Sequence, residues 1–240
     1  MYLYVRIIEK EDYYKGENAE FNYRVKLKLE EASGERCLIV PFEEFNMDAL
    51  KDLQPRAVAI SGFAKSFQFF DIKSFLGIDE FFHNSNIPTI AFCGGHQLMG
   101  FSFNQNLRKT ERLYDQGMKK LEPHEDGAVY QFGTERWYNT SDIHQITKVK
   151  EDPLFDGLPD SMLLPCYHYC EIKKLPDGFD ILASSAHCKI EAVKHKTRPL
   201  YGTQFHPESY NDRNQDGRII LENFAKITDN FWQGKQWSHV

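Results

Sequence analysis

The sequence contains no apolar run of the length that a signal peptide or a membrane-spanning helix requires. The apolar stretch at the amino terminus, residues 1–8, is short, and charged residues follow it at once. Positive charge is also scarce, because 29 lysines and arginines face 35 aspartates and glutamates and the formal net charge is −6. Since surfaces that bind nucleic acids or anionic membranes are basic, we expect neither kind of partner.

Cysteine is sparse and odd in number, with five residues spread over a chain of 240. Such a set does not form a disulfide framework and is typical of a reducing compartment, so we expect a cytoplasmic protein with free thiols. Internal repeats and low-complexity linkers do not stand out either. With 41% hydrophobic residues the chain can bury one sizeable core, and we expect a single domain over residues 1–240.

Short apolar runs alternate with amphipathic segments along the chain. The runs predict strands at residues 3–8, 37–41, 57–60, 87–92 and 200–205. Helices are expected at residues 21–31, 70–86 and 217–227. The first of these also alternates as a strand would, and we favour a helix there because parallel strands need a crossover. The alternation predicts an α/β fold with a mostly parallel central sheet flanked by helices on both faces.

The pattern changes after Met118 to short strands and turns. Strands are expected at residues 129–132 and within residues 161–172. We interpret this part of the chain as a small antiparallel addition to the central sheet.

Two short segments more than a hundred residues apart carry the chemistry. In the first, a predicted apolar strand runs straight into Cys93-Gly94-Gly95-His96-Gln97. The two glycines permit a tight turn from strand to helix, which would leave the thiol facing the surface at an elbow. Backbone N–H groups and the helix dipole at such an elbow favour the thiolate, which is the nucleophilic form of cysteine.

The second segment ends another apolar strand with Gln204-Phe205-His206-Pro207-Glu208. A histidine in this position can act as the base that a cysteine nucleophile needs. The carboxylate of Glu208, two residues further on, can bind the far ring nitrogen and hold the useful tautomer. Cys93, His206 and Glu208 are therefore predicted to form a catalytic triad.

These two motifs resemble, residue by residue, those of the class I glutamine amidotransferases. That family carries a Cys-x-Gly-His-Gln or Cys-x-Gly-Met-Gln elbow and a Gln-Phe-His-Pro-Glu segment. Residues 175–185 and 190–193 look most like the glutaminase half of GMP synthetases and their stand-alone relatives. The resemblance spans roughly residues 57–224 and implies the flavodoxin-like fold of the class I glutaminases.

The resemblance also implies a reaction and the residues that surround it. The side-chain amide of glutamine would be hydrolysed through a γ-glutamyl thioester, and the ammonia would be supplied to a separate synthetase, without a metal or an organic cofactor. The turn at Gly62 and the amide of Gly94 would stabilise the oxyanion. Gln97, His168 and Tyr169 match positions that line the glutamine pocket. The chain departs from the family where Gly62-Phe63-Ala64 replaces the usual Gly-Gly-Pro.

Two other functions are compatible with the same residues. The triad would also serve a stand-alone hydrolase of γ-glutamyl amides or peptides. The altered turn after Gly62 is the one feature that favours a weakly active regulatory or binding module.

Two further patterns have competing interpretations. Cys166, His168 and Cys170 would share one face of a strand, but their spacing is not that of a structural zinc site, and core packing is favoured. A basic cluster fits a solvated face better than a docking surface for a synthetase; its members are Arg108, Lys109, Arg112, Lys119 and Lys120.

Overall fold

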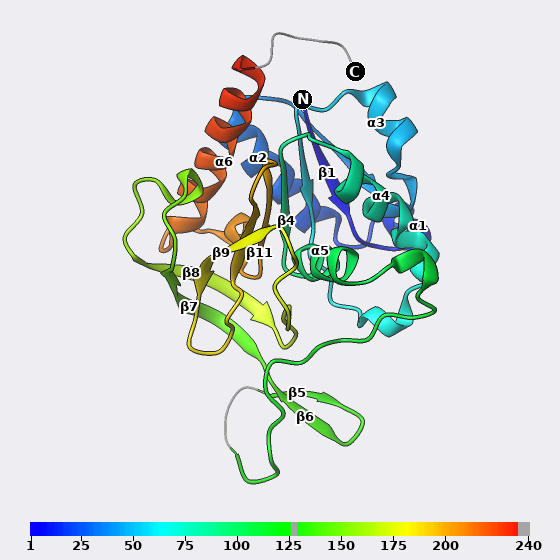
Figure 1. Ribbon diagram of the computed structural model, residues 1–240, viewed down its shortest axis with the longest axis vertical. Coiled ribbons are helices and arrows are strands. Elements are labelled where there is room, and N and C mark those ends of the chain that lie inside the picture. The colour runs from blue at the N-terminus through cyan, green and yellow to red at the C-terminus, as the bar shows by residue number, and fades with distance from the viewer. Residues whose placement is uncertain (126–128, 235–240) are drawn as a thin grey trace.

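The computed structural model describes residues 1–125 and 129–234. Nine of the strands in this part of the chain form one sheet, in the order β2-β1-β3-β4-β11-β10-β9-β7-β8 (Figure 1). In that order the strands are Cys37–Pro41, Tyr2–Arg6, Ala57–Ile60, Thr89–Phe92, Leu200–Thr203, Ala192–His195, Phe179–Ser184, Thr140–Lys148 and Ser161–His168. Every pair among the first five is parallel, and the other four strands continue the sheet in antiparallel pairs.

Helices cover both faces of the parallel part. Helices α2 (Ala19–Ser33) and α6 (Asp216–Gln233) contact each other on one face, and α3 (Met47–Leu53), α4 (Leu76–Asn84) and α5 (Gly94–Asn104) pack on the other. Strand β1 shows why two faces arise, since Tyr2 and Tyr4 enter the core beneath α2 and α6, whereas Leu3 and Val5 enter the opposite core. The predicted α/β fold with a mostly parallel central sheet is confirmed.

The helix predicted at residues 21–31 is confirmed by α2. The helix predicted at residues 70–86 begins later, at Leu76, because a separate 3-10 turn over Ile72–Phe75 precedes it and the carboxylate of Asp71 caps that turn. Helix α6 continues to Gln233, six residues beyond its predicted end. None of the helices in residues 1–125 and 129–234 is long and apolar enough to cross a membrane.

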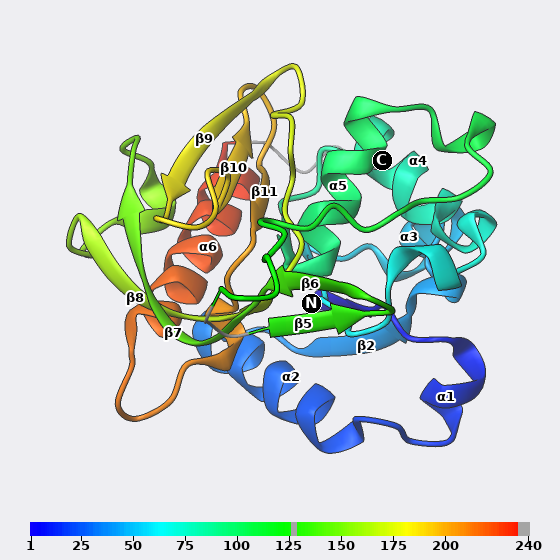
Figure 2. The same cartoon turned by 90° about the horizontal axis from the view of Figure 1, so that it is seen from below.

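The antiparallel part is larger than the sequence predicted. Strand β7 had no prediction, and it pairs along its whole length with β8, which ends at His168 instead of reaching residue 172. The strand predicted at residues 129–132 is confirmed as β5 (Val129–Phe132), but it pairs only with β6 (Glu135–Tyr138) in a separate hairpin. Figures 1 and 2 show this hairpin beyond the carboxyl ends of the parallel strands, where β4 leads into α5.

Candidate active site

Cys93 lies at the sharp turn between β4 and α5. Its backbone has φ 45° and ψ −106°, a conformation that non-glycine residues rarely adopt, and its N–H donates to the carbonyl oxygen of Thr203 at 2.7 Å. Neighbouring β11 therefore holds the strained residue in place. The thiol does not face the surface as expected, because Cys93 is only 5% exposed and lies at the wall of a cavity.

His206 and Glu208 follow the end of β11 and are directed to the same place. The N–H of His206 donates to the carbonyl oxygen of Pro165 at 2.8 Å, which ties the segment to β8. Nδ1 of His206 lies 2.7 Å from Oε1 of Glu208, and Glu208 is 2% exposed. Burial lowers the pKa of His206, but the charges of Glu208 and Cys93 and its hydrogen bonds to both outweigh burial and raise that pKa well above its usual value.

The two predicted oxyanion glycines lie against these side chains. A Cβ on Gly62 would be 3.0 Å from Cβ of Cys93, 3.2 Å from Cε1 of His206 and 3.5 Å from the amide nitrogen of Gly94. The turn after β3 thus approaches the elbow so closely that only glycine fits at position 62 without displacing a neighbour. A Cβ on Gly94 would be 2.5 Å from the ring of Phe63.

A cavity of about 190 Å³ opens beside the thiol. All three residues predicted to contact substrate line it: Gln97, His168 and Tyr169. Gln97 uses both hydrogens of its amide within the protein, donating to the carbonyl oxygen of Cys170 at 3.0 Å and to Oε1 of Gln204 at 3.1 Å. The amide of Gln204 in turn donates to Sγ of Cys93 at 3.5 Å. This chain of hydrogen bonds connects the pocket wall to the nucleophile.

Tyr169 lies at the side of the cavity nearest the hairpin. Its hydroxyl donates to the carboxylate of Asp115 and lies 3.1 Å from Oγ of Ser66. The ring of Tyr130, from β5, stacks on it with centroids 3.7 Å apart and an angle of 9° between the planes. His168, by contrast, points its Nδ1 at the carbonyl oxygen of Cys170, 2.9 Å away, and is 4% exposed.

Sequence reasoning missed several pocket residues. Asp115, Tyr130 and Asn139 line the cavity, and all three come from the segment that resembles the family least. Tyr167 also lines it, and its ring centroid is 5.6 Å from that of His206. The alternation of polar and aromatic residues along residues 129–138 was the one available signal.

The metal interpretation of Cys166, His168 and Cys170 named only part of the group that forms. The structure places Cys166 and His168 with Glu191, all buried, with one ligand atom of each within 4.8 Å of the others. Tetrahedral zinc would hold such atoms roughly 3.5 Å apart, given zinc bonds of about 2.0–2.3 Å. The group would have to contract to bind zinc, and a site without metal stays a prediction.

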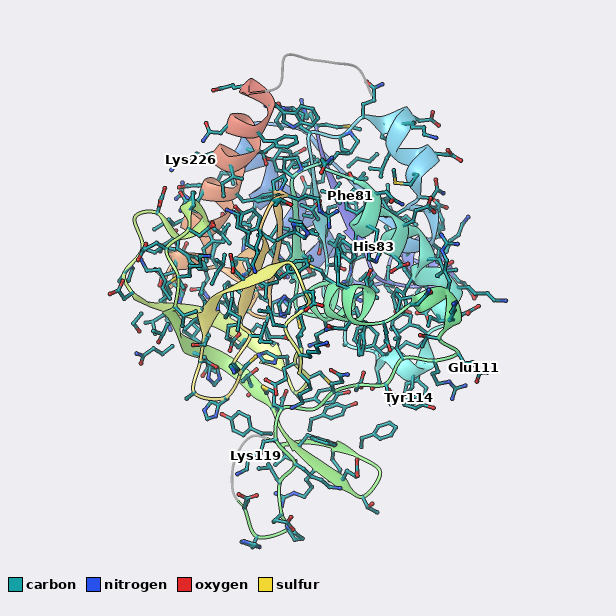
Figure 3. All side chains as sticks on the ribbon, in the orientation of Figure 1. Phe81, His83, Glu111, Tyr114, Lys119 and Lys226 are labelled. Carbon is teal, nitrogen blue, oxygen red and sulfur yellow. The ribbon has the colours of Figure 1, made fainter. Side chains whose placement is uncertain are left out.

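The basic cluster matches the interpretation as a solvated face. Arg108 pairs with Glu80 at 3.4 Å, Lys119 with Glu125 at 2.6 Å, and Lys120 with Glu135 at 2.7 Å. All three cations are more than half exposed, and Figure 3 shows Lys119 at the margin of the molecule beside the hairpin. Local carboxylates therefore balance much of the positive charge.

The sequence was compared with known families after this geometry was established. The family model "Glutamine amidotransferase class-I" matches residues 18–227, most of the chain. The chain therefore belongs to the class I glutamine amidotransferase family, and the resemblance found in the two motifs is confirmed.

Curated relatives are subunits of one enzyme, the glutamine-hydrolyzing GMP synthase. The chain is 33% identical to the subunit from Methanocaldococcus jannaschii over 60% of its own length and 62% of the relative's, slightly under two thirds. It is 28% identical to the subunit of the same name from Methanosphaera stadtmanae over 88% of its own length and 95% of the relative's. A crystal structure described as a GMP synthase subunit from Thermoplasma acidophilum has a TM-score of 0.66 and 23% identity, covers 97% of this chain and 96% of that one, and supports the fold alone.

Proposed function

We propose that this chain is a cytoplasmic glutaminase that hydrolyses the side-chain amide of glutamine and supplies ammonia to a separate synthetase, with residues 1–240 acting as one domain. The observation that carries the proposal is the convergence at one cavity of a strained cysteine, a histidine bound at 2.7 Å to a buried carboxylate, and two glycines packed around them. Membership of the class I family and the names of the curated relatives support the choice of glutamine.

The chemistry assigned to these residues has two halves. Cys93 thiolate attacks the carboxamide carbon, and the developing oxyanion accepts hydrogen bonds from backbone amides of the Gly62 turn and of Gly94. Protonated His206 gives its proton to the departing nitrogen, so the C–N bond breaks, ammonia leaves and a γ-glutamyl thioester remains. The raised pKa of His206 keeps that proton available at neutral pH. Neutral His206 then removes a proton from water, which attacks the thioester and releases glutamate and the thiolate.

The remaining assigned residues hold the reactants. Glu208 fixes the tautomer of His206 and balances its charge. Since both amide hydrogens of Gln97 are engaged within the protein, its Oε1 is the atom that would accept from the substrate ammonium group. His168 and Tyr169 form the wall against the rest of the amino acid. We assign no metal and no organic cofactor to this sequence of steps.

The test is release of glutamate and ammonia by the purified chain, with glutamine or with γ-glutamyl amides as substrate, in the presence and absence of proteins that co-purify from the native organism. We expect turnover of glutamine, slow in isolation and at least ten times faster with the partner. A high rate on γ-glutamyl amides alone would instead indicate the stand-alone hydrolase. Binding of glutamine without turnover under every condition would indicate the regulatory module and reject the proposal.

A further inference from the structure

Arg6 is a buried arginine at the carboxyl end of β1, and it is bound to the turn that faces the nucleophile. Its Nη1 donates to the carbonyl oxygen of Gly62 and, at 2.9 Å, to Oγ of Ser61. The same hydroxyl accepts the N–H of Ile7 at 2.8 Å. Arg6 is 9% exposed, and no carboxylate within the described residues forms an ion pair with it. Its charge is therefore directed at the turn and not neutralised by a neighbouring acid.

The bond to Gly62 determines how the turn presents its amide. The carbonyl oxygen and the following N–H point in opposite directions across a trans peptide, and the peptide bonds described here include no cis isomer. With the carbonyl oxygen of Gly62 held by Arg6, the N–H of Phe63 points away from Arg6. Phe63 lines the cavity and its ring lies against Gly94.

We infer that Arg6 is a positioning residue for the oxyanion site: it fixes the peptide between Gly62 and Phe63 so that the N–H of Phe63, together with that of Gly94, faces the carbonyl under attack. The inference rests on the proposed function and refines it, because it names the donor nitrogen in the turn. It also gives the turn a side-chain support where Phe63-Ala64 stands in this chain. The guanidinium charge polarises the same peptide, which makes its N–H a stronger donor.

The test compares two alkylating reagents on the full chain. A diazo-ketone analogue of glutamine carries a carbonyl that occupies the oxyanion site as Cys93 attacks, whereas iodoacetamide alkylates the same thiol without forming an oxyanion there. In Arg6→Ala we expect the rate of labelling by the diazo-ketone to fall about a hundredfold, the range seen when one oxyanion donor is lost. Labelling by iodoacetamide should change less than threefold and keep its pH profile.

Two further variants make the comparison specific. Arg198 is a matched control, because its Nη1 also donates to a backbone carbonyl, that of Phe82, at 2.6 Å, and it does not line the cavity. Arg198→Ala should leave the ratio of the two labelling rates unchanged. Adding guanidinium ion at tens of millimolar should restore the diazo-ketone rate of Arg6→Ala at least tenfold and have no such effect on the wild type. If Arg6→Ala does not fold, Arg6→Lys carries the same comparison, with a smaller loss expected because an ammonium lacks the planar fork.

The outcomes separate this inference from the proposed function. If both labelling rates fall equally in Arg6→Ala, or neither falls, Arg6 does not position the oxyanion turn, whatever the wild type does with glutamine. If the wild type is not labelled by the diazo-ketone at all, the proposed function fails and the inference fails with it. A selective loss of diazo-ketone labelling, rescued by guanidinium, supports both.

Discussion

The ring of Phe63 lies directly against the backbone of Gly94, so that a Cβ added to Gly94 would be 2.5 Å from Cε1 of that ring. The ring cannot easily move, because it also packs edge-on against Phe67 and Phe70, with centroids 4.8 and 5.1 Å away. The phenylalanine that replaces the usual glycine in the turn therefore contacts the first residue of the elbow helix. The two backbone segments assigned to the oxyanion are linked by this contact.

Substitution of Gly94 by alanine should therefore misplace both segments. Because the ring or the helix would have to shift by roughly 1 Å, and misplacements of that size can cost about a hundredfold in rate, we expect Gly94→Ala to lose at least that much glutaminase activity. Phe63→Ala in the same chain removes the clash and should recover at least tenfold. Steady-state kinetics of the two single variants and the double variant measure the coupling. A double variant no faster than Gly94→Ala would show that the clash is not the cause.

Cys93 should be the only cysteine that a glutamine-like electrophile modifies. Burial raises the pKa of the Cys37 thiol to about 12, and it also raises the pKa of each of the other three, Cys166, Cys170 and Cys188. Those thiols are therefore poor nucleophiles at neutral pH. Peptide mapping by mass spectrometry after treatment with the diazo-ketone should find one adduct, on Cys93. Cys93→Ala should fold, take up no label and have no turnover; a labelled or active Cys93→Ala would contradict the assignment of the nucleophile.

The triad should show a hierarchy of effects. His206→Ala removes both the proton donor to ammonia and the base for water, and we expect a loss on the order of a thousandfold or more in kcat. Glu208→Gln keeps a hydrogen-bonding group beside Nδ1 and should lose less. Thermal denaturation of each variant controls for unfolding, since Glu208 is almost fully buried. Full activity in His206→Ala would exclude the mechanism.

The pH dependence of kcat/KM should extend well above pH 6.5 on its alkaline side. Although burial lowers the pKa of His206, Glu208 and Cys93 raise it above its ordinary value, so the imidazolium persists above neutrality and is lost only as the pH rises through that raised pKa. Glu208→Gln removes the larger of the two charges that raise it, so the alkaline limb should move to lower pH. The limbs belong to the coupled cysteine–histidine pair and not to one residue. An alkaline limb that is unmoved in Glu208→Gln would argue against the electrostatic role of Glu208.

Much of the fold was predictable because it is written in local patterns. Strand β3 is fully buried and reads as an unbroken apolar run, which is typical of parallel strands covered on both faces. The elbow was equally local, since a strand, a cysteine and two glycines are consecutive. Strand β7 was not predicted because it is mostly exposed, with polar residues throughout, and it acquires its conformation by pairing with β8. Nothing in its own residues marks it.

The pocket was less predictable, because its contacts join distant parts of the chain. Tyr130 and Tyr169 stack across 39 positions, and no periodicity within either segment indicates the other. Arg6 reaches Gly62 from 56 positions away, between two strands whose order in the sheet had to be known first. Side chains that act through the backbone of another segment in this way are visible only once the strands are placed next to each other.

Glu191 makes the stability of the protein depend on pH in a direction opposite to that of most carboxylates. It is 1% exposed, and burial is the main cause that raises its pKa to about 7. Its Oε2 has no hydrogen-bond partner among the described residues. Between the ordinary pKa near 4.5 and the raised value, the folded state holds a proton that the unfolded state has released. Stability should therefore decrease as the pH rises through this interval.

Glu191→Gln removes the ionisation while keeping the shape of the side chain. A raised pKa of this size corresponds to at most about 3 kcal/mol of unfolding free energy, so the variant should gain on the wild type by up to that amount between pH 5 and pH 8. Chemical denaturation of both proteins at several pH values measures the difference. Glu43→Gln, at an exposed carboxylate, is the control and should give a nearly constant difference across the same range. A difference between Glu191→Gln and the wild type that is equally flat would mean that Glu191 is already ionised in the folded protein at pH 5.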